Sequence, residues 1–315
     1  MAAKLYRNGY LKVGDGHQIY YECYGKPDLE PVLFIHGGPG GHLKPKYLTG
    51  IDTEKCFAVL YDQRGCGKSL PIGEINHNTT SDLINDIDLL LKHLNIKKVS
   101  IYAGSWGACL ALLYAETKPK TVKRMFLNCS FLARQEDKEF LYDKIKTIFP
   151  DYYDDFIKKI PPQYRNNPSA YLYREIINGS LERQKEVACL MANYEYSLLN
   201  LTYNQSSALD TENMVPEDII PTKIFLHYEA NDFFIEDNQI INNASKIKKI
   251  PITFVHGRFD MDAPLSGVWH LHRKLPLSDL TIVPYEGHSG ELKKTLLVKA
   301  LNNYLSSKNH PCNEE

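Results

Sequence analysis

Short hydrophobic runs recur along the first 130 positions of the chain and alternate with a helical pattern. PVLFI, from position 31, is a continuous apolar run of the kind buried on both faces of a sheet, and CFAVLY (56), VSIYA (99) and VKRMFL (122) are also typical of strands. The segment SDLINDIDLLLKHLNI, positions 81–96, instead repeats leucine and isoleucine every three or four residues, which predicts a helix with Ser81 as its N-cap. Strands that alternate with helices predict a mainly parallel α/β sheet.

Two further regions complete the predicted organisation. YLKVGDGHQIYYECYG, near the N-terminus, predicts a β-hairpin with Gly14, Asp15 and Gly16 in the turn. From about position 134 the chain becomes rich in charge, tyrosine and asparagine with helical patterns, and buried strands return only near position 250 with ITFVHG and LTIVPY. We therefore expect an α/β core domain formed by residues 1–133 and 248–315, and an inserted helical cap domain, residues 134–247.

Composition narrows the cellular setting. The 315 residues are 43% hydrophobic, and 37 basic side chains nearly balance 38 acidic ones. Because the chain has no excess of positive charge, we do not expect nucleic acid as a partner. The N-terminus lacks the apolar stretch of a signal peptide, and the longest apolar run, positions 106–115, is too short to span a bilayer. The seven cysteines include no CxxC pair, so neither a disulfide framework nor a metal site is indicated. We expect a cytoplasmic protein with no membrane partner; the sequence leaves its oligomeric state open.

Ser105 is the strongest candidate for chemistry. In YAGSWGACLALLYA it stands between Gly104 and Gly107 where a strand gives way to a helix, close to the G-x-S-x-G nucleophile elbow. Small neighbours permit the tight turn that lifts a serine hydroxyl clear of the backbone. The motif's first glycine is Ala103, which is still small. The alternative is a serine that merely caps the helix.

A nucleophilic serine needs a base to take its proton and an acid to orient that base. In hydrolases built on an α/β sheet of this kind, these residues follow one another along the chain in the order Ser, Asp or Glu, His. Asp260 and His288 follow two successive predicted strands, at the edge where parallel sheets collect their active groups. Asp262 is a competing acid, and His256 and His36 are competing imidazoles beside glycines. The alternatives are that Asp260 only forms a turn and that His288 is a surface residue.

The glycine-rich segment HGGPGG, from position 36, follows a strand and could cradle phosphate, receive an oxyanion or simply turn the chain. It lacks the lysine of a GxxxxGK[ST] loop and the spacing of GxGxxG, so phosphate binding is disfavoured. We expect His36 to anchor the loop and Pro39 to stiffen it through its fixed φ. Cys66 and Cys109 lie near these segments, but neither is centred in an elbow, so we interpret both as small buried residues.

The blocks HGGPGG, DQRGCGKS, NTTSDLINDIDLLLKHLNI, GSWG, HGRFDM and GHS occur in this order, and together they resemble the proline iminopeptidases, serine peptidases of the α/β-hydrolase fold. The resemblance extends from about Tyr10 to Tyr304. It implies a mostly parallel sheet with an inserted helical cap, and a triad of nucleophile Ser105, acid Asp260 and base His288. In such a site the backbone N–H groups of Trp106 and Gly38 would receive the oxyanion.

The resemblance also implies that two cap glutamates bind the substrate's free amine. Glu195, in MANYEYSLL, and Glu229, in LHYEANDFF, stand at those positions, although Met191 and Tyr194 replace the family's tryptophans. The alternative is that both lie on solvated helix faces. Candidates for an apolar proline pocket are aromatic residues near the cap boundaries, for which the alternative is ordinary core packing: Phe131, Tyr142, Phe233 and Phe234.

The sequence thus predicts a serine exopeptidase that releases an N-terminal residue, preferably proline, from short peptides with a free N-terminus, and that needs no metal or cofactor. Ala263 replaces a pocket cysteine of many relatives, so an aminopeptidase or amino-acid amidase of broader specificity is the main alternative. An esterase would not require paired cap acids, and epoxide hydrolysis in this fold uses an aspartate at the elbow. A catalytically silent binding protein is a further alternative, since fold alone does not give function.

Overall fold

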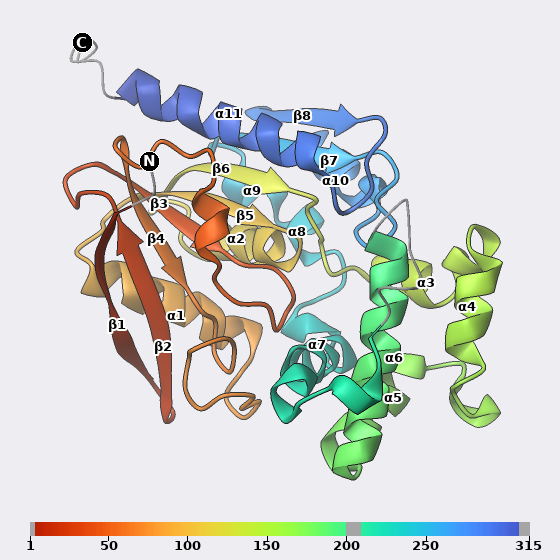
Figure 1. Ribbon diagram of the computed structural model, residues 1–315. Coiled ribbons are helices and arrows are strands. Elements are labelled where there is room, and N and C mark those ends of the chain that lie inside the picture. The colour runs from red at the N-terminus through yellow and green to blue at the C-terminus, as the bar shows by residue number, and fades with distance from the viewer. Residues whose placement is uncertain (1–3, 200–208, 309–315) are drawn as a thin grey trace.

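The computed structural model describes residues 4–199 and 209–308, and these form one eight-stranded sheet with helices on both faces (Figure 1). The strand order is β1-β2-β4-β3-β5-β6-β7-β8. Pairing is antiparallel from β1 through β2 to β4 and parallel from β4 to β8. The strands are β1 (Leu5–Gly14), β2 (His17–Tyr24), β3 (Glu30–Ile35), β4 (Cys56–Tyr61), β5 (Val99–Gly104), β6 (Val122–Asn128), β7 (Ile252–Gly257) and β8 (Ser278–Val283).

The predicted hairpin and the predicted parallel strands are confirmed. β1 and β2 meet at a two-residue turn where Asp15 and Gly16 both have positive φ. In β3, Leu33 and Ile35 pack into the apolar cluster on one face of the sheet, while Val32 and Phe34 pack into the cluster on the other. A continuous apolar run is therefore required here, because both faces of the central strands are covered.

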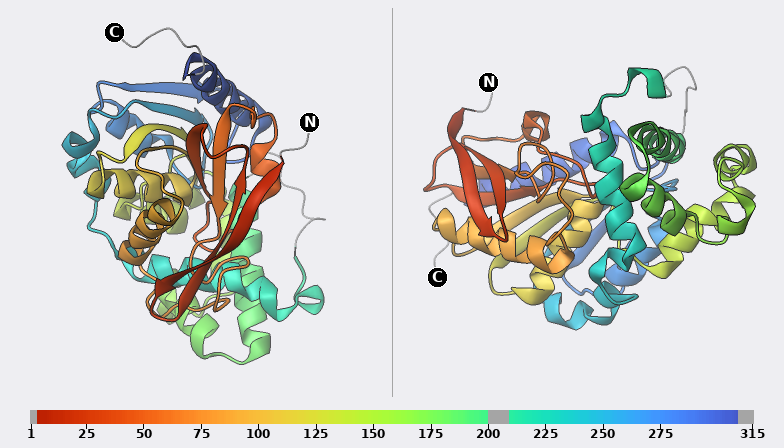
Figure 2. Two further views of the ribbon diagram at one scale, coloured as in Figure 1. Left: turned by 90° about the vertical axis from the view of Figure 1, so that its left-hand side faces the viewer. Right: turned by 90° about the horizontal axis from the view of Figure 1, so that it is seen from below.

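Helices cover the two faces unequally (Figures 1 and 2). α1, α2 and α10 contribute apolar residues to one cluster, together with α8 and α9, whereas α11 covers the opposite face. The bounds of these helices are α1 (Thr80–His93), α2 (Trp106–Thr117), α8 (Gln239–Asn242), α9 (Ala244–Ile247), α10 (Leu265–His272) and α11 (Glu291–Lys308). A short 3-10 helix, η1 (Pro45–Leu48), also lies on the α11 side through Leu48.

The N-cap of α1 differs from the prediction. The cap is Thr79, not Ser81: the Asp82 N–H donates to the Thr79 hydroxyl at 3.4 Å, and the Thr79 N–H donates to the Asp82 carboxylate at 2.9 Å. This reciprocal capping box satisfies two N–H groups, whereas a cap at Ser81 would satisfy fewer. The helix therefore begins one residue before Ser81.

Between β6 and β7 the described chain is mainly helical, and its part from Leu141 to Leu226 builds an apolar cluster of its own. In Figure 1 these helices stand to one side of the sheet, beyond the carboxyl ends of β5 and β6. They are α3 (Gln135–Tyr142), α4 (Pro150–Ile157), α5 (Pro168–Asn178), α6 (Leu181–Leu199) and α7 (Ile220–Ala230), with short 3-10 turns η2 (Lys144–Thr147), η3 (Pro162–Tyr164), η5 (Thr211–Asn213), η6 (Pro216–Ile219) and η7 (Asp232–Phe234). Residues 200–208 of the expected cap lie outside the described residues.

None of the helices within residues 4–199 and 209–308 combines the length and the hydrophobicity that crossing a bilayer requires.

Candidate active site

Ser105 occupies the turn between β5 and α2 with a strained backbone. Its φ of 56° and ψ of −130° are rare for a residue with a side chain, and its N–H donates to the carbonyl of Asn128, at the end of β6, at 3.0 Å. Strain of this kind persists only where the surroundings impose it, and it is the signature of a nucleophile elbow. The turn presents the side chain at the carboxyl edge of the sheet.

Glycine is required at position 107 because α2 packs closely on the end of β3. A Cβ atom added to Gly107 would lie 2.3 Å from the carbonyl oxygen of Ile35 and 2.8 Å from that of His36. Both obstacles are backbone atoms, which cannot move aside cheaply. Ala103, by contrast, is buried at 2% exposure, so its methyl group is accommodated. The departure from G-x-S-x-G therefore falls where a small side chain fits.

The structure brings Asp260 and His288 into direct contact. Asp260 follows β7 and His288 follows β8, and Nδ1 of His288 lies 2.9 Å from Oδ1 and 3.0 Å from Oδ2 of Asp260. Oδ1 of Asp260 also accepts the backbone N–H groups of Ala263 (2.8 Å) and Asp262 (3.2 Å). The carboxylate is thus fixed by the loop and faces the imidazole.

Each member of this pair shifts the pKa of the other. Burial alone would raise the pKa of Asp260, but the His288 charge and hydrogen bond hold it at about 2. Burial alone would lower the pKa of His288, but Asp260 and Asp262 more than offset this and raise it to about 9. Asp260 is therefore ionised near neutral pH, as an acid that orients an imidazole must be.

Glycine at position 257 allows the two loops to meet. A Cβ atom on Gly257, the last residue of β7, would lie 2.3 Å from the carbonyl oxygen of Gly287. The N–H of Phe259 donates to the Glu286 carbonyl at 3.0 Å. These backbone contacts join the loop that carries Asp260 to the loop that carries His288.

The competing residues occupy different places. The Asp262 carboxylate lies 3.5 Å from Nε2 of His288, on the opposite side of the ring from Asp260. His256 is fully buried behind Asp260, with Nε2 3.4 Å from its carboxylate and 2.8 Å from the Ala263 carbonyl oxygen. Burial lowers the pKa of His256, which suits a neutral structural residue.

Ser105 and His288 line one cavity of about 880 Å³, which extends to Tyr47 in η1 and to Lys299 on α11. Gly37 and Cys129 line the same cavity. Within the described part of the chain no hydrogen bond joins the Ser105 hydroxyl to His288 in this conformation. The serine and the imidazole thus share a cavity, while Nε2 faces Asp262.

The HGGPGG loop lies against the elbow and is anchored from beneath. A Cβ atom on Gly37 would lie 3.3 Å from the Ser105 Cβ. The His36 Nδ1 donates to the Gly37 carbonyl (2.9 Å), and its Nε2 accepts the Gln63 backbone N–H (3.0 Å). Burial lowers the pKa of His36 to about 4, so the ring stays neutral, as this acceptor role requires. The expected anchoring by His36 is therefore present in the geometry.

Gln63 links that loop to α2, the helix that follows Ser105. Its side-chain amide donates to the His36 carbonyl at 2.9 Å, and its Oε1 accepts the indole N–H of Trp106 at 2.9 Å. Trp106 is fully buried, so its backbone is held next to Ser105. Sequence reasoning did not single out Gln63, although the DQRG segment that carries it was recognised as a motif.

Glu195 and Glu229 come from different helices and face the same region. Glu229, on α7, is buried and accepts the Tyr142 hydroxyl at 2.6 Å; burial raises its pKa to about 7 despite that hydrogen bond. Burial, followed by the negative charge of Asp262, raises the pKa of Glu195, on α6, and its charge also interacts with those of His288 and Glu229. Glu229 is therefore buried and Glu195 half-buried, so neither side chain is fully solvated.

The predicted aromatic residues divide into separate groups. Phe131 and Phe233 pack ring to ring at 5.1 Å, and the ring of Phe233 lies 5.6 Å from that of Trp106, the residue directly after Ser105. Phe234 packs instead on His227 and Tyr228. Tyr142 binds Glu229 as described above. Of the four, Phe131 and Phe233 are therefore the pair beside the elbow.

Cys129, at the end of β6, was not identified from the sequence. Its thiol lies 3.3 Å from the His288 carbonyl oxygen, and its donor atom, with those of Asp260 and His288, falls within 4.8 Å, close enough to hold a metal ion. The Asp260 and His288 donors already bind each other, and burial raises the pKa of the thiol far above its ordinary value. Cys66 and Cys109 are buried, with thiol pKa values likewise raised by burial.

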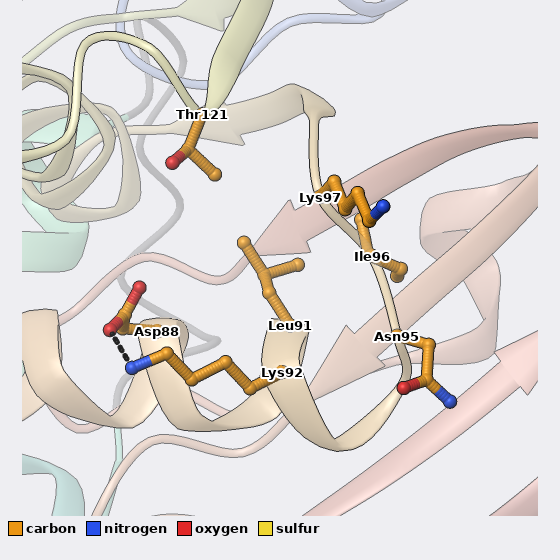
Figure 3. Close-up of a pocket in the computed structure, with 7 residues that line it drawn as sticks. All are labelled: Asp88, Leu91, Lys92, Asn95, Ile96, Lys97 and Thr121. Carbon is orange, nitrogen blue, oxygen red and sulfur yellow. Dashed lines mark ion pairs between the residues drawn. The ribbon is translucent and has the colours of Figure 1, made fainter.

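A second hollow, of about 400 Å³, lies at the C-terminal end of α1 (Figure 3). Its rim includes Lys97 and Thr121, which precede β5 and β6, and an ion pair between Asp88 and Lys92 at 2.8 Å. It therefore lies at the amino ends of the strands, away from Ser105. None of the predicted site residues lines it.

The chain is similar in sequence to a known protein family and to several of its members. Residues 30–294 match the family model described as the alpha/beta hydrolase fold. The chain is 37% identical over 286 residues to a probable proline iminopeptidase of Leptolyngbya boryana, covering 90% of this chain and 89% of that protein. It is also 37% identical over 287 residues to the proline iminopeptidase of Arabidopsis thaliana, covering 90% and 75% respectively.

Among solved structures, an esterase from Exiguobacterium antarcticum matches with a TM-score of 0.64 at 17% identity, covering 95% of this chain and all of that one. A likeness at this identity concerns the fold alone, because the same scaffold carries many chemistries. Residues of the site, and relatives of much higher identity, must therefore decide between peptidase and esterase.

Proposed function

The chain belongs to the proline iminopeptidase family of α/β-hydrolases and is a prolyl aminopeptidase; we propose that it releases N-terminal proline from short peptides through Ser105, Asp260 and His288. The observation that carries this assignment is the hydrogen-bonded Asp260–His288 pair beside a serine with φ of 56°. Relatives about 37% identical over 90% of the chain support the substrate class.

In the proposed mechanism, His288 takes the Ser105 proton through Nε2 as the serine attacks the amide carbonyl. Asp260 holds the ring by Nδ1, fixes its tautomer and stabilises the imidazolium. His288 then gives the proton to the leaving amine. In the second step His288 takes a proton from a water molecule as the water attacks the acyl-enzyme, and returns that proton to Ser105 as the acyl group leaves. The chemistry uses side chains and backbone alone, without metal or cofactor.

We propose that the Trp106 and Gly38 N–H groups stabilise the tetrahedral oxyanion. The support is positional: Trp106 begins the helix after the nucleophile, and the loop passes Ser105 at Gly37, next to Gly38. Losing one such donor typically costs about 2.7–4 kcal/mol of transition-state stabilisation.

Glu195 and Glu229 are the proposed ligands of the substrate's ammonium group. A cation inside a closed site needs negative partners to compensate for its desolvation. Glu229 is 2% exposed and held by Tyr142, so it is a fixed rather than a mobile acid. For the prolyl ring we propose the apolar surface of Phe131 and Phe233, with Tyr142 and Phe234 supporting it from behind.

We propose residues 134–247 as a cap on a core of residues 1–133 and 248–315, narrowing access so that folded proteins are excluded. The separate apolar cluster from Leu141 to Leu226 supports a cap that packs as a unit. We further propose a cytoplasmic enzyme with short peptides as partners and neither nucleic acid nor membrane binding.

Two measurements test the proposal. A serine-directed organophosphorus label should modify wild type at Ser105 and leave Ser105→Ala unmodified; an unlabelled, inactive wild type would remove the enzyme assignment. Kinetics on prolyl, alanyl and leucyl anilides should then give the highest kcat/KM for proline. If alanine or leucine is cleaved as well as proline, the protein is a broader aminopeptidase of the same fold.

A further inference from the structure

The Asp262 carboxylate lies beside Nε2 of His288, the ring nitrogen that the proposed mechanism uses as a base. Its Oδ2 lies 3.5 Å from Nε2 of His288, and the two side chains are only 18% and 13% exposed. In the proposed mechanism Nε2 is the atom that accepts the Ser105 proton. In the empty site this nitrogen therefore faces a carboxylate instead of the serine hydroxyl.

His288 is surrounded by acidic groups from several elements. Asp260 binds Nδ1 and Asp262 faces Nε2, both from the loop after β7, and Glu195 acts on the ring from α6. Behind Asp260 lie neutral His256 and the protonated Cys129 thiol. Burial by itself would lower the pKa of His288, but these acidic groups outweigh it and raise the pKa to about 9.

An imidazole with so high a pKa is protonated near neutral pH and cannot serve as a base. The groups that keep it charged adjoin the proposed ammonium site. Glu195 and Asp262 interact electrostatically, and the last turn of α6 is tied to the histidine loop where the Ser289 N–H donates to the Leu199 carbonyl at 3.0 Å. A cation bound to Glu195 would therefore act directly on the charges that hold His288 protonated.

We propose that Asp262 makes hydrolysis depend on the substrate's free amine, by holding Nε2 of His288 in the empty site and releasing it when an ammonium group binds beside Glu195 and Glu229. This inference rests on the proposed function and assigns Asp262 as a specificity-determining, positioning residue. The bound ammonium attracts the Asp262 carboxylate and offsets its negative charge. His288 then loses its Nε2 proton to water, and Nε2 becomes free to accept the proton of Ser105.

The test compares Asp262→Asn with wild type on prolyl p-nitroanilide and on the N-blocked N-acetylprolyl p-nitrophenyl ester. Without the Asp262 charge, the acid limb of kcat/KM for the blocked ester should move down by about one pH unit or more. At pH 7 its hydrolysis should rise about tenfold. The ratio of kcat/KM for the free-amine substrate to that for the blocked ester should fall by a similar factor.

Two variants serve as controls. Asp262→Glu retains the charge and should restore a profile close to wild type, which a purely structural role would not require. Asp279→Asn removes an exposed aspartate on the neighbouring strand β8 and should change neither profile. An unmoved acid limb for the blocked ester, or equal changes for both substrates, would overturn the role of Asp262.

A second measurement does not depend on the folding of the Asp262 variants. In Ser105→Ala, the NMR titration of His288 should give a pKa lower by about one unit or more with prolinamide bound than without it. An unchanged pKa would reject the coupling. Failure of the proposed function would look different, since wild type would then neither cleave prolyl p-nitroanilide nor be labelled at Ser105.

Discussion

His288 and Asp260 are 28 residues apart in the chain, yet Nδ1 of the histidine lies within 3.0 Å of both carboxylate oxygens of the aspartate. The contact arises because β7 and β8 are adjacent parallel strands whose carboxyl ends meet at one edge. The Asp260 carboxylate also accepts backbone N–H groups of its own loop. The geometry therefore fixes the orientation of the Asp260 carboxylate.

Asp260→Asn should lower kcat on prolyl p-nitroanilide by about 10⁴-fold. An amide at this position offers a donor to Nδ1 and so favours the wrong tautomer of His288. Steady-state kinetics measure the effect, with Asp279→Asn as the matched control on the surface. A loss below about tenfold in a folded Asp260→Asn protein would argue against its role.

The same pair should make stability depend on pH. The pKa of Asp260 falls from 3.8 to about 2 on folding, so its stabilisation is present above pH 3.8 and is lost as pH falls towards 2. The pKa of His288 rises from 6.5 to about 9, so its stabilisation is present below pH 6.5 and is lost as pH rises through 9. The Tm difference between wild type and Asp260→Asn should thus be greatest between pH 3.8 and 6.5. Thermal melts of both proteins across pH 2–10 measure this difference. A Tm difference that stays constant with pH would contradict the prediction.

Glu195→Gln and Glu229→Gln should each lower kcat/KM for prolyl p-nitroanilide by about tenfold to a hundredfold, since each removes a charged partner of the ammonium group. The N-acetylprolyl ester, which has no ammonium group, should lose far less. Because burial raises the pKa of Glu229 to about 7, KM of the free-amine substrate in wild type should also rise as pH falls below that value.

Glu186→Gln is the matched control for these two variants. Glu186 lies on the same helix as Glu195, but it is exposed and pairs with Arg183. Equal losses on both substrates in the Glu195 or Glu229 variants would remove the claim of amine recognition.

Gln63→Ala should reduce both stability and turnover. The buried Trp106 indole N–H and the His36 carbonyl each lose a partner, at about 1–3 kcal/mol per unsatisfied group. Because these groups position the loop and the first residue of α2, kcat should fall more than KM changes. The control is Gln135→Ala, whose side chain bonds Asp232 at the surface, with an expected change within about 0.5 kcal/mol. Denaturant unfolding and kinetics together test this, and a Gln63 variant with wild-type kcat would contradict it.

Gly107→Ala should destabilise the protein and lower activity, because its methyl carbon would lie 2.3 Å from the Ile35 carbonyl oxygen. α2 would have to move away from β3, and Ser105 with it. In Gly9→Ala the nearest atom is the Tyr21 hydroxyl at 3.4 Å, so that variant should be close to neutral. Thermal melting distinguishes them, and equal Tm values for the two variants would refute the packing argument.

Much of the fold was predictable because its signals are local. The run PVLFI predicts β3, since a strand with both faces covered must be apolar at every position. GDG predicts the hairpin turn, since such a turn demands residues with positive φ. The small residues around Ser105 likewise predict a tight strand-to-helix turn. The helix cap was the exception: Thr79 and Ser81 are both good caps, and only the reciprocal bonds with Asp82 favour Thr79.

The sequence by itself determined which residue types stand at the strand ends and in what order, because periodicity and turn chemistry are properties of short segments. Tertiary structure alone decided which of them meet. Asp260 and Asp262 are two residues apart, yet one faces Nδ1 of His288 and the other Nε2. Gln63 links the HGGPGG loop to the first residue of α2, and the Cys129 thiol lies beside the His288 carbonyl oxygen. These contacts join residues far apart in the chain. Such contacts depend on strand order and loop packing, which no local pattern encodes.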